Sequence, residues 1–424
     1  MKAFLGTGIT VGIMMALTIA SGILTSRLLG VDERGILALV MLWPAVCGVL
    51  ADLGTPIAIV QRAAVSKAEG AYALANLGLM SGILATLALP IGIAGVVLSN
   101  LSRNQLALAV LSLLIVTPMT ISGRLFGALS QGLGNYRHYN YSKLVGPSIW
   151  LVLPLALYAT HNVSLYSIVA SYLAAAIVGF LAAAWPYRNM FSYPSRSTLN
   201  DLVALAREGL PNYLGNLTPI DSLKLDVALV GILFSATDVG YYSIAVSAAY
   251  LVRVFGFVVG IIALPTVSRS KGTRLGAICI RVISSVAFSG SLLAGMLMLV
   301  ALPILIPLVY GRSFSPAVTP AQILAIGMAA AGFRQALGDC MRGIGKGKLV
   351  SWIELSSWAV AIIGGAILIP TLGLNGIAIA VSLSYISAAT LCLILSAHQL
   401  EVSYASLMVP NVKATRTMIA NQLA

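Results

Sequence analysis

Charged side chains inside long apolar stretches are the residues of this sequence with the most evident chemistry. The set comprises Asp52, Arg124, Asp221, Lys224, Asp226, Arg253, Arg334, Asp339 and Glu354. An ionisable group is costly in hydrocarbon, so such groups face a cavity or one another. Guanidinium groups bind phosphate through forked, charge-assisted hydrogen bonds. A carboxylate shielded from water can take up a proton or Na⁺. The expected chemistry is therefore anion binding and ion coupling.

The same charges could instead pair within the protein. Asp221 and Lys224 have the i,i+3 spacing of a helical ion pair. Asp226 could serve as a structural anchor, whereas Arg334 would reach Asp339 only loosely because residues five apart do not share a helix face. The sequence leaves both interpretations open.

Histidine and cysteine show no catalytic or metal-binding pattern. The three histidines lie far apart in the sequence, and the four cysteines all lie inside apolar runs without metal-ligand spacing. We therefore expect no cofactor, no metal and no enzymatic activity.

The composition indicates what must hold these charges. Hydrophobic residues make up 59% of the chain and charged residues 9%, with a net charge of +13, and the mean hydropathy is +0.97. Soluble domains carry roughly 25% charged residues. Apolar stretches longer than about 17 residues are typical of helical spans rather than of β-barrel strands. The sequence therefore predicts an all-α polytopic membrane protein, and the basic residues between the spans do not indicate nucleic acid binding.

Hydropathy predicts about twelve transmembrane helices. Their approximate ranges are 4–26, 36–60, 73–99, 105–131, 144–160, 165–185, 208–234, 240–265, 279–308, 318–341, 349–369 and 375–397.

The loop charges predict the orientation. With the N-terminus in the cytoplasm, 17 of the 25 lysines and arginines fall in inner segments and 4 in outer segments. An excess of Lys and Arg in short cytoplasmic loops is the usual bias. We expect both termini in the cytoplasm.

The two halves of the sequence resemble each other. Spans six and twelve match at an offset of 213, as in Tyr172 and Tyr385. The loops QGLGN and RGIGK match at an offset of 211, and the outer turns match loosely at 205, with Gly35 aligned to Gly240. Repeats six spans apart are parallel, a common plan in transporters. We expect an N-lobe of residues 1–195, with spans one to six, and a C-lobe of residues 196–424, with spans seven to twelve and a cytoplasmic tail.

Three segments resemble polysaccharide transporters: SRLLGVDERGILALV (26–40), ADLGTPIAIVQR (51–62) and LDVALVGILFSATDVGYYSIAV (225–246). This family includes O-antigen and capsule flippases. Its superfamily also holds multidrug and toxic compound extrusion exporters and the peptidoglycan lipid-precursor flippase. The first span carries no acidic residue, unlike many multidrug exporters, and the precursor flippases usually have fourteen spans. Both differences favour the O-antigen branch.

The resemblance implies a flippase that moves a polyprenyl-pyrophosphate-linked oligosaccharide by alternating access. Its partners would be that lipid-linked substrate, membrane lipid and other polysaccharide-assembly proteins. Arg334 maps at offset 211 onto residue 123, next to Arg124, so both arginines could line a central cationic cavity. The predicted substrate-binding residues are Arg124, Arg334, Lys224 and Arg253. The ion-coupling candidates are Asp52, Asp226 and Glu354, and Arg27 is either a gate or an interfacial residue.

Two other functions are open at this level. A multidrug or small-cation exporter of the same fold would need an acidic or apolar cavity. A membrane glycosyltransferase or polymerase would need a sizeable outer loop, but the predicted outer loops have about ten residues or fewer.

Overall fold

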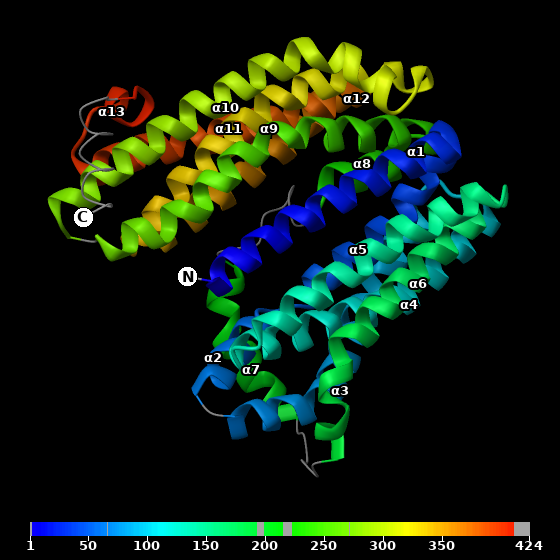
Figure 1. Cartoon of the computed structure of the whole chain (residues 1–424). Helices are drawn as coiled ribbons and strands as arrows, with labels where there is room; N and C mark the ends of the chain where they lie inside the picture. Colours follow the sequence, from blue (N-terminus) through cyan, green and yellow to red (C-terminus); the bar gives the residue numbers. More distant parts are fainter. Residues whose placement is uncertain (1, 66, 193–198, 215–222, 271, 411–424) are drawn as a thin grey trace. The chain divides into compact units, whose positions relative to one another are not determined.

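The computed structural model describes residues 2–65, 67–192, 199–214, 223–270 and 272–410. All regular elements in these ranges are helices (Figure 1). The chain divides into two compact units, Met1–Gly240 and Tyr241–Ala424. The division into lobes at residue 195 stays a prediction.

Unit 1 is built on three long helices that pack side by side (Figure 1): α4 (Arg103–Gly132), α5 (Tyr136–Ala159) and α6 (Leu165–Ala184). The helix α1 (Lys2–Leu50) packs along α4 and α5. The remaining elements are α2 (Thr55–Val65), α3 (Lys67–Leu98), η1 (Trp185–Ser192), α7 (Leu199–Leu214), α8 (Leu225–Leu233) and the first residues of α9.

Unit 2 is a second bundle. It consists of most of α9 (Ala236–Arg269), then α10 (Arg274–Val309), η2 (Arg312–Ala317), α11 (Val318–Gly343), α12 (Gly347–Leu400) and α13 (Tyr404–Met408). The helix α11 packs between α10 and α12, and 56% of the apolar 18-residue window within Arg312–Gly343 is buried. Although α10 contains Pro303 and Pro307, it forms one continuous helix.

The described residues contain nine helices that are long and apolar enough to cross a membrane. Two of them, Gly6–Leu50 and Gly347–Leu400, have 45 and 54 residues. A span needs about 20 residues, so each of these two is long enough for two spans. Predicted span seven lies partly outside the described residues, in α7, residues 215–222 and α8. The chain is an all-α polytopic membrane protein.

Glycines separate the paired spans in α1 and α12. Gly30 has φ 74° and ψ −173°, and Gly373 has φ 56° and ψ −130°. A residue with a β-carbon is strained at such positive φ values, whereas glycine adopts them readily. Arg34 stabilises the first of these turns, since its Nε donates to Ser26 Oγ at 3.0 Å.

The internal repeat is visible in the packing of each unit. In unit 1, a β-carbon at Gly132 would lie 2.8 Å from the carbonyl oxygen of Val60. In unit 2, one at Gly343 would lie 3.2 Å from the carbonyl oxygen of Leu264. Gly132 aligns with Gly343 at the offset of 211 that the loops predict. The equivalent glycine therefore permits the same close helix approach in both units.

Candidate functional site

A cavity of about 650 Å³ lies within unit 1, between α1, α2, α4, α5 and α6. Most of its wall consists of apolar side chains, glycine and alanine. The polar lining residues are Asp52, Thr120, Arg124, Gln131, Tyr139, Ser142 and Lys143. Its size and mixed lining are typical of small-molecule sites.

A break in the second predicted span places Asp52 in this cavity. The helix α1 ends at Leu50, and α2 begins at Thr55 after a turn in which Leu53 and Gly54 have φ values of 45° and 75°. The carbonyl of Asp52 accepts from the backbone N–H of Thr55 at 2.9 Å and from its hydroxyl at 2.8 Å. These bonds hold the turn that carries the Asp52 carboxylate. The sequence had predicted an unbroken span over 36–60, so this part of the prediction was wrong.

Arg124 on α4 is the partner of Asp52. Its Nη1 donates to Asp52 Oδ2 at 3.2 Å and to the carbonyl oxygen of Gly48 at 3.3 Å. The Arg124 side chain is 41% exposed and that of Asp52 is 19% exposed. The pair therefore lines the cavity without being sealed from it, and Arg124 retains donors that can reach a ligand.

Two contacts hold α7 against this broken span. A β-carbon at Gly54 would overlap the backbone of Gly209, and one at Gly209 would overlap that of Gly54. Arg62 on α2 donates through Nη2 to Glu208 Oε1 at 2.6 Å and through Nε to Oε2 at 3.0 Å. This bidentate pair fixes α7 on α2, the helix that contributes Pro56, Ile57 and Val60 to the cavity lining.

Lys143 on α5 is a second cation in the cavity. Its Nζ lies 4.7 Å from the ring centroid of Tyr139, one helical turn earlier. Among the described residues, Lys143 forms no ion pair. From the sequence, Lys143 was expected in a cytoplasmic segment between spans. The alignment of Lys143 at offset 211 with Glu354, a residue predicted inside a span, could have identified Lys143 as a candidate site residue.

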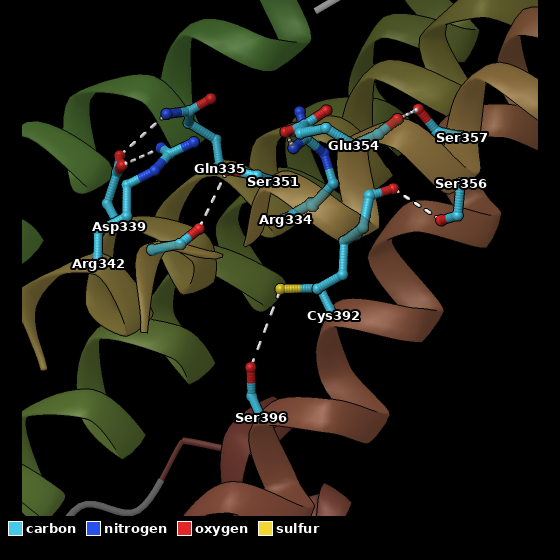
Figure 2. Close-up of polar contacts among 12 residues, drawn as sticks. Arg334, Gln335, Asp339, Arg342, Ser351, Glu354, Ser356, Ser357, Cys392 and Ser396 are labelled. Carbon is cyan, nitrogen blue, oxygen red and sulfur yellow. Dashed lines mark hydrogen bonds and ion pairs between the residues drawn. The ribbon is translucent and has the colours of Figure 1, made fainter. Parts of the chain in front are cut away.

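Unit 2 holds a contrasting polar cluster between α11 and α12 (Figure 2). Arg334 Nη1 forms an ion pair with Glu354 Oε1, and the side chains are 2% and 8% exposed. One helical turn away, Asp339 accepts from Arg342 at 2.8 Å and from Gln335 at 3.0 Å. The internal pairing that the sequence left open is thus realised for Arg334, but across two helices and with Glu354 rather than Asp339.

Arg253 is also buried in unit 2, at 7% exposure. Its guanidinium lies 5.8 Å from the ring centroid of Tyr250 and 6.0 Å from that of Tyr385. Aromatic faces attract a cation at this distance.

The other predicted site residues lie in unit 1. Asp226 is buried in the first turn of α8, while Lys224, just before α8, is exposed and has φ 47°. Arg27 is exposed on α1, just before the Gly30 turn. Asp221 lies outside the described residues. Of the predicted site residues, the described cavity of unit 1 includes Asp52 and Arg124.

Solved structures with the same fold are membrane transporters. The chain is similar to "Lipid II flippase MurJ, inward closed conformation", with 15% identity, TM-score 0.73 and coverage of 98% of this chain and 90% of that one. It is also similar to an inward-facing multidrug resistance MATE family transporter of the MOP superfamily, with 16% identity, TM-score 0.67 and coverage of 93% and 98%. A third match is the eukaryotic MATE transporter AtDTX14, with 13% identity, TM-score 0.62 and coverage of 99% of both chains.

Comparison with curated proteins gives no match. The profile of one protein family, described as "Polysaccharide biosynthesis protein", matches residues 24–319, which is well over half of the chain. The chain therefore belongs to this polysaccharide biosynthesis family.

Proposed function

We propose that the protein is a flippase that moves a polyprenyl-pyrophosphate-linked oligosaccharide, such as an O-antigen or capsule repeat unit, across the bacterial cytoplasmic membrane. The observation that carries the proposal is the cavity of unit 1, which presents Arg124, Lys143 and several hydroxyl and amide groups in a chain of the polysaccharide biosynthesis family. Guanidinium and ammonium groups suit phosphate, and hydroxyl and amide groups suit sugar.

Alternating access follows from this proposal. The polyprenyl tail can stay in lipid, so only the phosphates and the glycan need a polar path between the helices. The repeats would change conformation so that the cavity of unit 1 opens to one side of the membrane at a time. Both termini would lie in the cytoplasm. The candidates for further substrate contacts are Lys224, Arg253 and Arg334. The candidates for ion coupling are Asp52, Asp226 and Glu354, and the candidate for a gate is Arg27.

Export of surface polysaccharide tests the flippase proposal. Cells that lack the gene should accumulate the lipid-linked glycan on the cytoplasmic side and lose surface polysaccharide. The variant Arg124→Ala should restore at most about a tenth of the export, because a charged hydrogen bond to the substrate is lost. The variant Arg103→Ala, on the same helix but outside the cavity lining, is the matched control and should restore export fully. Normal surface polysaccharide in the gene deletion would refute the function.

A drug exporter is the second candidate function. The similarity to MATE transporters and the largely apolar cavity wall support it. The carboxylate of Asp52 could then attract a cationic drug. A deletion strain that becomes sensitive to lipophilic cations while its surface polysaccharide stays normal would favour this candidate over the flippase.

A further inference from the structure

The helix pairs α4–α5 and α11–α12 share one register, which allows residue-by-residue comparison of the two repeats. A β-carbon at Gly127 on α4 would lie 3.9 Å from the Tyr139 ring on α5. A β-carbon at Gly338 on α11 would lie 3.3 Å from the Val350 side chain on α12. Both the glycines and their partners differ by 211 positions. The offset therefore identifies equivalent places between the helices.

At this register the Arg334–Glu354 pair corresponds to Gly123 and Lys143. In unit 2 the arginine and glutamate side chains fill the space between the helices and are buried. In unit 1 both equivalent residues line the cavity. A β-carbon at Gly123 would meet no other atom within 4 Å. The cavity of unit 1 is thus the place where unit 2 has an internal ion pair.

The charges in this cavity do not cancel. Arg124 and Lys143 are cations, and Asp52 is the one carboxylate among the described lining residues. Asp52 and Gly48 occupy only Nη1 of Arg124, so among described contacts Nε and Nη2 make no hydrogen bond. The Lys143 ammonium has three donors and contacts an aromatic face. An anion with several acceptor oxygens would satisfy these donors and neutralise the excess charge.

We propose that the position left open by Gly123 is a phosphate subsite, in which Lys143 and Arg124 bind a phosphate or pyrophosphate ester of a lipid. The subsite deepens the proposed flippase function and rests on it for the identity of that lipid. Lys143 stands where unit 2 has Glu354. Gly123 leaves open the space that the Arg334 side chain fills in unit 2, and the anion binds in that space beside Lys143. The subsite therefore belongs to the first repeat alone.

Rebuilding the ion pair of unit 2 in unit 1 is the decisive experiment. The purified full chain in nanodiscs is titrated with labelled polyprenyl pyrophosphate, with phosphatidylglycerol and inorganic pyrophosphate as competitors. The variant Lys143→Glu should weaken binding about tenfold or more because one cation is replaced by an anion. The double variant Gly123→Arg/Lys143→Glu should abolish measurable binding because the new pair fills the subsite. Arg137→Glu, which makes the same charge change on α5 outside the cavity lining, should bind as the wild type does.

Further variants and competitors separate the possible outcomes. Lys143→Arg should retain binding within about threefold because it preserves the charge. If the double variant does not fold, the comparison of Lys143→Arg with Lys143→Glu decides whether the positive charge at residue 143 binds the anion. Competition by pyrophosphate but not by phosphatidylglycerol would assign the site to the lipid-linked glycan, and the reverse result would assign it to a phospholipid head group. Wild-type affinity in Lys143→Glu and in the folded double variant would overturn the subsite. If export of polysaccharide still depends on the gene, the flippase proposal would survive that result.

Discussion

Asp32 and Thr237 occupy equivalent positions of the two repeats, and they contact each other. Thr237 Oγ1 donates to Asp32 Oδ1 at 2.5 Å, and the two residues differ by the same 205 positions as the outer turns. The surrounding contacts are reciprocal. A β-carbon at Gly35 would overlap the carbonyl oxygen of Ala236, and one at Gly240 would overlap that of Val31. The two equivalent outer turns therefore contact each other reciprocally within unit 1.

A disulfide at this contact should stop transport. The double variant Asp32→Cys/Thr237→Cys places two thiols where the wild-type side chains already meet. If transport separates these turns, an oxidised bond should reduce polysaccharide export by at least about tenfold. Reduction should restore the export. The two single variants are controls and should export normally under oxidation. Full export in the oxidised double variant, with the disulfide shown by gel mobility, would show that these turns stay in contact during transport.

The buried Arg334–Glu354 pair should be a stability element of unit 2. Replacing Glu354 by alanine leaves the 2%-exposed Arg334 without its carboxylate, which typically costs about 3–5 kcal/mol. The thermal midpoint of the purified protein should fall clearly. The double variant Arg334→Met/Glu354→Leu should recover most of the loss because it buries no charge.

The Arg62–Glu208 pair of unit 1 provides the matched comparison. Its side chains are 24% and 47% exposed, and exposed pairs contribute about 0–1 kcal/mol. Glu208→Ala should therefore lower the thermal midpoint only slightly. A similar loss in Glu208→Ala and Glu354→Ala would show that burial does not set the contribution of the Arg334 pair.

Hydropathy predicted most of the helical architecture because helix length and apolar composition are local properties. The span ranges on α3, α4, α6 and α11 agree with the helices closely. The break at residues 51–54 was missed. A four-residue turn with Leu53 in the left-handed region does not show in the mean hydropathy of a span-length window. The partner of Arg334 was also missed because it depends on how α11 packs against α12, which no spacing within α11 reveals.

The candidate site shows the same division between local and tertiary information. Asp52 and Arg124 stood out because charge inside an apolar run is visible in the sequence, but their pairing joins residues 72 positions apart. Lys143 lay near a span end and was assigned to a loop. Only the start of α5 at Tyr136 and its common register with α12 show that it faces the cavity.

Removing the carboxylate of Asp52 should strengthen anion binding. In the structure Asp52 Oδ2 takes one Arg124 donor at 3.2 Å, so it competes with a bound phosphate for the same guanidinium. Asp52→Ala should lower the Kd for polyprenyl pyrophosphate by about threefold to tenfold, since each tenfold change is about 1.4 kcal/mol. Glu33→Ala, which removes an exposed carboxylate outside the cavity lining, should leave the Kd unchanged. Weaker binding in Asp52→Ala would indicate that the carboxylate instead orients Arg124 for the substrate.

Cysteine labelling can determine the membrane orientation, because the four native cysteines are buried and should give little background. Exposed Arg137 lies in a predicted cytoplasmic segment and exposed Arg312 in a predicted outer one. In intact cells, a membrane-impermeant maleimide should modify Arg312→Cys but not Arg137→Cys. Both should react after the cells are opened. Labelling of Arg137→Cys in intact cells would invert the topology, and the cavity residue Lys143, on the same helix, would then lie towards the outer side. In that case the subsite would receive substrate from outside, which a flippase for a cytoplasmically made glycan does not require.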